Sequence, residues 1–113
     1  MSAITTHILD ISRGRPAEGV AVILEHRIAE GWQVLGRGTT DADGRLRSLL
    51  PDGFDLREGA YRLTFRTLDY FAGVGVETFY PEVTIIFVVA DAAAHYHVPL
   101  LVSPYGYSTY RGS

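Results

Sequence analysis

The chain of 113 residues is 47% hydrophobic and 20% charged, which is the balance of a globular chain rather than of a disordered one. At this length we expect a single domain, residues 1–113, built on one core. The net charge of −3 and the pI of about 5.7 argue against a nucleic-acid partner. All ten cationic residues are arginine and there is no cysteine, which excludes Schiff-base lysines, thiol nucleophiles, disulfides and thiolate metal sites.

The opening residues "MSAITTHILD" have neither the basic region nor the long apolar region of a secretory signal. No apolar run approaches the roughly 20 residues that a membrane-spanning helix needs. We therefore expect a cytoplasmic protein with no membrane partner.

Short apolar segments, many of them rich in β-branched residues, alternate with turn residues along the chain. Strands are expected at 3–9, 20–28, 32–40, 60–68, 82–90, 95–103 and 107–113, with a short candidate within 45–50. Loops are expected at 10–19 and 51–59, and an Asp-Gly turn at 41–44.

The segment 60–68 shows the clearest strand pattern. Tyr61, Leu63 and Phe65 fall on one side of it and polar residues on the other, as in a half-buried strand. Residues 69–75 allow one or two helical turns, because their glycines disfavour a long helix. Seven or eight short strands without sustained helical periodicity indicate an all-β sandwich or barrel.

The C-terminal segment "HYHVPLLVSPYGYSTYRGS" carries the densest chemistry of the chain. His95 and His97 are two residues apart in an expected strand, so their side chains point the same way. A metal site would need a third ligand from His7, His26 or a carboxylate, and the spacing resembles no known zinc motif. General acid–base chemistry needs only one well-placed imidazole, whereas an isolated pair can equally be two half-exposed sheet histidines. The four tyrosines of this segment are typical of an oligomer interface.

Two further polar residues are candidates only in combination with others. Taken alone, His7 is an ordinary surface histidine and Arg45 an ordinary solvated residue after a turn. A guanidinium, however, is a flat fork of donors suited to carboxylate, urate-like or imide oxygens.

The stretches "HILDISRGRPAEGVAV" and "YHVPLLVSPYGYSTY" resemble the N-terminal and C-terminal signatures of the transthyretin family. The resemblance covers essentially the whole chain. His7 before "ILD", Arg45 in "DGR", His97 in "HYH" and the terminal "YRGS" are similar to the enzyme branch of that family rather than to its hormone carriers. The resemblance implies a two-sheet sandwich of about eight strands with one short helix near 68–75. It also implies a homotetramer, a dimer of dimers, with active sites in the channel between the dimers.

For this branch the implied reaction is hydrolysis of 5-hydroxyisourate at its N1–C6 bond, in urate degradation. The product is 2-oxo-4-hydroxy-4-carboxy-5-ureidoimidazoline, and no cofactor or metal is implied. The resemblance assigns proton transfer to His7 and His97 and assigns Arg45 to the substrate oxygens, with His7 also in contact with substrate. It adds Tyr110, Arg111 and Ser113 as residues that bind substrate or shape the pocket. Which histidine is the base, and what His95 does, stay open.

Three alternatives belong to other classes. A carrier would bind a small aromatic ligand in the tetramer channel, but a channel lined by histidine and arginine is costly to desolvate without a polar ligand. A purely structural sandwich would make His7, Arg45 and His97 incidental. A zinc hydrolase would use the "HYH" pair.

Overall fold

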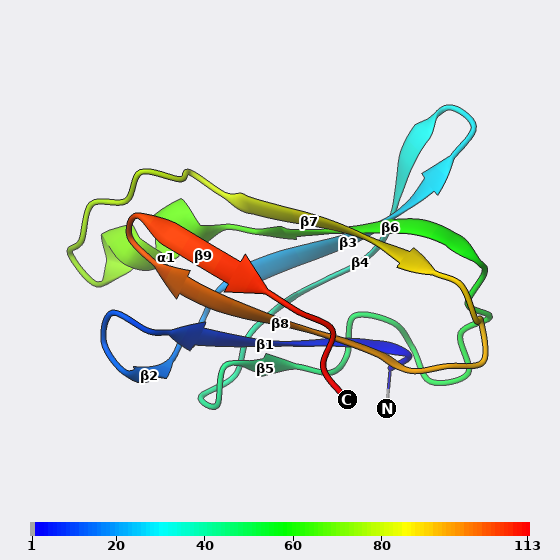
Figure 1. Cartoon of the computed structure of the whole chain (residues 1–113), viewed down its shortest axis with the longest axis horizontal. Coiled ribbons are helices and arrows are strands. Elements are labelled where there is room, and N and C mark those ends of the chain that lie inside the picture. The colour runs from blue at the N-terminus through cyan, green and yellow to red at the C-terminus, as the bar shows by residue number, and fades with distance from the viewer. Residues whose placement is uncertain (1) are drawn as a thin grey trace.

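The computed structural model describes residues 2–113, and it consists of two stacked β-sheets with one short helix at one end (Figure 1). In chain order the elements are β1 (Ile4–Asp10), β2 (Arg15–Pro16), β3 (Ala21–Ile28), β4 (Gly31–Thr39), β5 (Arg45–Leu46), β6 (Gly59–Phe65), α1 (Thr67–Gly73), β7 (Val83–Val89), β8 (Tyr96–Ser103) and β9 (Gly106–Thr109). The expectation of an all-β sandwich with a helix near 68–75 is confirmed.

The two sheets differ in topology. In the five-stranded sheet, β1 runs parallel to β8 along one edge and pairs with the short strands β2 and β5 along the other, while β9 is antiparallel to β8. The four-stranded sheet has the order β4-β3-β6-β7 and is antiparallel throughout. The first and last thirds of the chain therefore meet in one sheet, which brings "TTH" beside "HYH".

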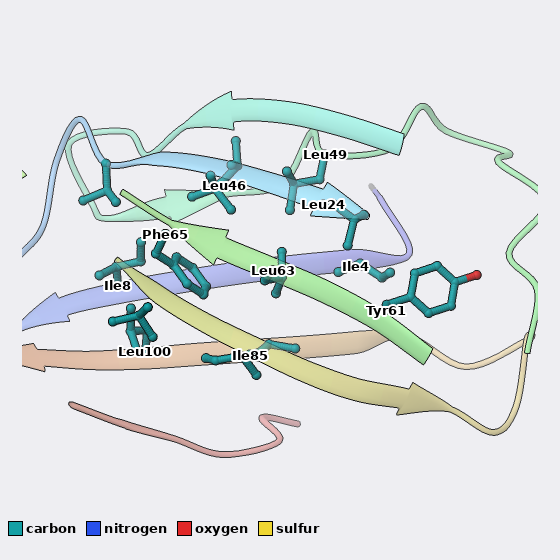
Figure 2. Packing of buried hydrophobic residues seen from close by; sticks show 14 of the residues in the cluster. Ile4, Ile8, Leu24, Leu46, Leu49, Tyr61, Leu63, Phe65, Ile85 and Leu100 are labelled. Atoms are coloured by element: carbon teal, nitrogen blue, oxygen red, sulfur yellow. The ribbon is translucent and has the colours of Figure 1, made fainter. Parts of the chain in front are cut away.

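The core fills the space between the sheets (Figure 2). Tyr61, Leu63 and Phe65 of β6 are 1%, 0% and 0% exposed, which confirms the predicted alternation of that strand. From the other sheet, Ile4 and Ile8 of β1 meet them at 0% exposure. Because alternate residues of a strand face opposite ways, this burial forces Thr5 and His7 onto the outer face of the five-stranded sheet.

The helix is tied to β1 through a buried carboxylate. The Tyr70 hydroxyl donates to Asp10 Oδ2 at 2.7 Å, and Asp10 Oδ1 accepts the main-chain N–H groups of Ser12 and Arg13. Asp10 is 0% exposed, so these hydrogen bonds replace the water that its carboxylate would otherwise keep. The loop expected at 10–19 contains one element that the sequence pattern missed, the two-residue strand β2.

The strand expected over 107–113 is interrupted. Its regular part, β9, ends at Thr109, and the pairing with β8 resumes only where Gly112 N–H donates to the His97 carbonyl at 2.8 Å. The gap lies opposite Pro99, which has no N–H to donate to a neighbouring strand. The Pro99 carbonyl accepts a hydrogen bond from the Thr109 hydroxyl at 2.7 Å. The tail nevertheless keeps its register and runs along β8 to the outer face of the sheet.

Candidate active site

Three strands bring the predicted histidines and arginine together on the outer face of the five-stranded sheet. In the parallel pairing of β1 with β8, Thr5 lies opposite His97. On the other edge of β1, His7 lies opposite Arg45 of β5. His7, Arg45 and His97 are far apart in sequence, and the central strand β1 is what makes them neighbours.

The Asp-Gly turn that leads into β5 fixes both Arg45 and His7. Asp41 Oδ1 accepts the N–H groups of Asp43 and Arg45 at 2.9 and 3.0 Å. The N–H of Arg45 is the largest influence on the pKa of Asp41, which is lowered from its ordinary value. The Asp43 carbonyl in turn lies 2.9 Å from His7 Nε2; since a carbonyl can only accept, His7 Nε2 carries the proton of this hydrogen bond.

The same turn packs tightly against β1 and needs a glycine at Gly44. Ile8 N–H donates to the Gly44 carbonyl at 2.7 Å. Gly44 has φ +76°, and a Cβ on it would lie 2.3 Å from the Ile8 carbonyl oxygen. Both the backbone conformation and the space therefore exclude a side chain here.

A cavity of about 270 Å³ opens beside these residues. All of its lining residues have polar side chains, and two of them are arginines; they come from β1, from β5 and β8 with the residues next to these strands, and from Ser113: Thr5, Thr6, Arg45, Arg47, His95, His97 and Ser113. Two guanidiniums, two imidazoles and three hydroxyl groups in one cavity suit a small, oxygen-rich, polar ligand rather than an apolar one.

His97 is the half-buried imidazole of this cavity. Burial lowers its pKa from the ordinary value of 6.5, and the nearby Arg45, His7 and His95 lower it further, against a hydrogen bond with the main chain of Thr5 that raises it. A lowered pKa keeps the ring neutral at neutral pH. His97 is therefore available there as a proton acceptor.

The terminal "YRGS" segment reaches the cavity through Gly112. A Cβ built on Gly112 would lie 2.6 Å from His97 Cδ2 and 3.3 Å from Pro99 Cγ, so the main chain of the tail packs directly on the imidazole. This close approach places Ser113 in the cavity lining. Figure 1 shows the C-terminal end beside β5, in keeping with the lining shared by Ser113 and Arg45.

Not every residue predicted for the site lies in the cavity. Arg45, His97 and Ser113 line it, whereas His7 lies next to it, close enough for its charge to lower the pKa of His97. Tyr110 and Arg111 instead line a separate hollow of about 260 Å³. This second hollow lies between β7 and β8 and is otherwise mainly apolar, with Ile85, Ile86, Phe87, Val88, Tyr96, Val98 and Thr109. Arg111 Cζ lies 4.5 Å from the centroid of the Tyr96 ring there.

The sequence pattern did not single out three of the cavity residues, Thr5, Thr6 and Arg47. Arg47 is two positions after Arg45, and strand-like alternation alone would have placed both on one side. Thr5 had no comparable signal, because its importance depends on the pairing of β1 with β8, in which Thr5 and His97 are 92 positions apart.

The third histidine considered as a metal ligand lies elsewhere. His26 is on β3 of the four-stranded sheet, where it stacks on Tyr61 with ring centroids 4.3 Å apart. Within residues 2–113, no three His, Asp or Glu side chains are grouped so that they could hold a metal ion. The same residues include no helix with the length and apolar character to cross a membrane.

Comparison with known proteins places the chain in one family. Residues 4–112 match the HIUase/Transthyretin family, and the chain belongs to it. The chain is 51% identical over 117 residues to the 5-hydroxyisourate hydrolase of Caulobacter vibrioides, an alignment that covers 100% of both proteins. The predicted resemblance to the transthyretin family and its enzyme branch is thus confirmed.

Solved structures on both branches of the family superpose on this chain. The 5-hydroxyisourate hydrolase of Klebsiella pneumoniae does so with a TM-score of 0.84 at 42% identity, covering 97% of this chain and 98% of that one. Sea bream transthyretin in complex with thyroxine gives a TM-score of 0.90 at 30% identity, covering 97% and 94%. The fold therefore does not distinguish the enzymes from the thyroxine-binding protein. That distinction depends on the side chains of the site.

Proposed function

We propose that this chain is an enzyme that hydrolyses 5-hydroxyisourate, opening the six-membered ring at the N1–C6 bond to give 2-oxo-4-hydroxy-4-carboxy-5-ureidoimidazoline. The observation that carries the proposal is the joint position of His97 and Arg45 in one cavity. It is supported by full-length similarity to the 5-hydroxyisourate hydrolases of Caulobacter vibrioides and Klebsiella pneumoniae. A single transthyretin-like domain over residues 1–113 and a cytoplasmic location are parts of the same proposal, the latter tested by cell fractionation.

The reaction requires three things of the site: a base for water, a cation at the carbonyl oxygen and a proton for the leaving nitrogen. Neutral His97 takes a proton from water as the new bond to C6 forms. Arg45 holds the C6 oxygen and stabilises the negative charge that develops on it. The C6–N1 bond then breaks, and N1 leaves with a proton.

His7 supplies the proton for N1 in this scheme. Its Nε2–H is held by the Asp43 carbonyl, so the ring has a fixed orientation beside His97. The acid form of His7 is the imidazolium, protonated on Nδ1 as well, and this second N–H proton is passed to the leaving nitrogen. Proton exchange with solvent then removes the proton that His97 took from water and reprotonates His7, which closes the cycle. Ser113, which lines the same cavity, contacts the substrate through its hydroxyl or its carboxylate, or orients a histidine.

The active assembly in this proposal is a homotetramer, a dimer of dimers. Strands β7 and β9 end their sheets, and neither has a second strand partner among residues 2–113. Ile86 and Val88 on β7 are 58% and 68% exposed, an unusual display of apolar surface on an open edge. A second copy added along these edges would cover them and bring a partner surface to Tyr110 and Arg111. Sedimentation of the wild type against Val88→Glu tests this, since a charge on that edge should dissociate the assembly.

A carrier is the second candidate, because the thyroxine complex of sea bream transthyretin superposes so closely. Burying an iodinated aromatic ligand against Arg45, Arg47 and His97 would desolvate their polar groups without replacing the lost hydrogen bonds. We therefore expect no tight thyroxine binding.

Two measurements on the same preparation decide between enzyme and carrier. Freshly generated 5-hydroxyisourate, followed by its near-ultraviolet absorbance, should decay much faster with the protein than in buffer. Calorimetric titration with thyroxine should give no heat of specific binding. Decay at the buffer rate together with thyroxine binding would reverse the assignment.

A further inference from the structure

The Thr5 hydroxyl lies between the two imidazoles of "HYH". Thr5 Oγ1 is 2.8 Å from His97 Nδ1 and 3.3 Å from His95 Nε2. Thr5 is only 4% exposed, so water does not readily replace either partner. The proposed function uses His97 and gives no role to Thr5 or His95.

When the Thr5 proton is donated within the trio, hydrogen-bond roles allow two arrangements. A threonine hydroxyl has one proton to donate and lone pairs to accept, and a neutral imidazole has one N–H and one bare nitrogen. Either Thr5 accepts from His97 Nδ1–H and donates to His95 Nε2, or it donates to His97 Nδ1 and accepts from His95 Nε2–H. The two arrangements give opposite chemistry, because only the first leaves His97 Nε2 with a free lone pair.

The proposed role of His97 favours the first arrangement. Nδ1 is the ring nitrogen that faces the Thr5 hydroxyl, so Nε2 is the nitrogen left for a water molecule in the cavity. Nε2 can take a proton from water only if it carries none itself, which puts the proton of the neutral ring on Nδ1. Because the Thr5 hydroxyl then accepts from Nδ1–H, its own proton is available to His95 Nε2 at 3.3 Å.

We propose that Thr5 and His95 are positioning residues that hold neutral His97 in the tautomer with its proton on Nδ1, leaving Nε2 as the base. The chain of hydrogen bonds runs from His97 Nδ1–H to Thr5 Oγ1, and from Thr5 O–H to His95 Nε2. His95 carries its own proton on Nδ1. This inference rests on the proposed function for the use of Nε2, but the tautomer itself is a property of the protein without substrate.

The arrangement stays intact through a catalytic cycle. When Nε2 takes a proton from water, His97 becomes a cation and its Nδ1–H donates to Thr5 more strongly. The hydrogen bond therefore favours the protonated ring, against burial and the charges of Arg45 and His7. His95 also lowers this pKa, and Arg47 and Ser113 line the same cavity.

Three variants and one control separate positioning from mere structure. Thr5→Val keeps the shape and removes the hydroxyl, Thr5→Ser keeps the hydroxyl, and His95→Ala removes the final acceptor. Thr40→Val is the matched control: Thr40 is also 4% exposed, and its hydroxyl also makes two hydrogen bonds, to the Ala17 carbonyl and from Val20 N–H. Thr40 has no contact with the histidines.

The first readout is the ¹⁵N spectrum of the imidazoles in the intact wild type above pH 7, where the two tautomers differ clearly. We expect His97 to be protonated on Nδ1 and His95 likewise. The second readout is turnover: Thr5→Val should lower kcat by about 10- to 100-fold, the scale on which partners that orient a histidine usually act. The acid limb of the pH–activity profile of Thr5→Val should move to lower pH, because a hydrogen bond that favours the cationic form of His97 is lost. Thr5→Ser should keep the rate and the pH profile of the wild type, and the kcat of His95→Ala should lie between those of the wild type and Thr5→Val. Thr40→Val should change stability only.

The outcomes distinguish this inference from the proposed function. A His97 proton on Nε2 overturns the inference whatever the activity, and so does a Thr5→Val enzyme with the wild-type rate and pH profile. If the wild type does not accelerate 5-hydroxyisourate decay, the proposed function fails while the spectrum still decides the tautomer.

Discussion

Gly112→Ala is the sharpest structural test of how the C-terminal tail serves the site. The added Cβ would lie 2.6 Å from His97 Cδ2. Non-bonded carbons approach to about 3.5–4.0 Å, so the imidazole or the tail must move by about 1 Å. A displacement of about 1 Å in catalytic geometry typically costs about 100-fold in rate. We expect kcat/KM for 5-hydroxyisourate to fall by about that factor.

The fold itself should tolerate this substitution. Neither Gly112 nor His97 belongs to the hydrophobic core, and the displaced imidazole borders a cavity. The midpoint of urea unfolding should therefore stay near that of the wild type. Gly73→Ala is the control, because a Cβ there meets nothing within 4 Å and the helix α1 gains a better helix former. A Gly112→Ala protein with wild-type kcat/KM would refute the claim that the tail seats His97.

Three further predictions concern the base, the second arginine and the helix anchor. Because the pKa of His97 is lowered from 6.5, more than half of its rings are neutral at pH 6.5, and the acid-side midpoint of the kcat/KM profile should lie below that pH. A midpoint at or above pH 6.5 would contradict this. Arg47→Met should raise KM by about tenfold with little change in kcat, since Arg47 offers one charge-assisted hydrogen bond to bound substrate. The control variant Arg37→Met, on the other sheet, should change neither KM nor kcat. Equal effects of the two arginine variants would show a general charge effect instead. Tyr70→Phe removes one of the hydrogen-bond donors of the buried Asp10 carboxylate, and it should lower the free energy of unfolding by about 1.5–3 kcal/mol while activity is retained. A loss below about 0.5 kcal/mol in urea titration would contradict the anchoring role.

The strand pattern predicted most of the fold because burial alternates so cleanly. Tyr61, Leu63 and Phe65 give a period of two that no helix would bury, and the glycines around 73–75 limit α1 to two turns. Short pairings escaped this logic. The strand β2 is two residues long and exposed, so it leaves no hydrophobic signature.

The tail shows how a single residue can divide a predicted strand. Tyrosines and threonine favour an extended strand through 107–113, and the register with β8 is kept to Gly112. The break comes from the partner strand, where Pro99 lacks the N–H that a regular ladder needs. A strand's own residues cannot reveal the partner that will interrupt it.

The candidate site was predictable where a residue could be matched to a family motif. His7, Arg45, His97 and Ser113 were named that way, and the fold brings them to one face. Thr5 was not named as a candidate. Its contact with His97 comes from a parallel pairing between the two ends of the chain, which periodicity within either strand cannot disclose.

The central claim is that His97 activates water for hydrolysis of 5-hydroxyisourate in the cavity on the outer face of the five-stranded sheet. The most direct measurement compares the decay of fresh 5-hydroxyisourate in buffer, with wild-type protein and with His97→Asn. Asparagine can keep a hydrogen bond with Thr5 but has no basic nitrogen. Rapid decay with the wild type and a loss of about 100- to 10,000-fold with the variant would support the account. A variant as fast as the wild type would place the base elsewhere, and a wild type no faster than buffer would contradict the account altogether.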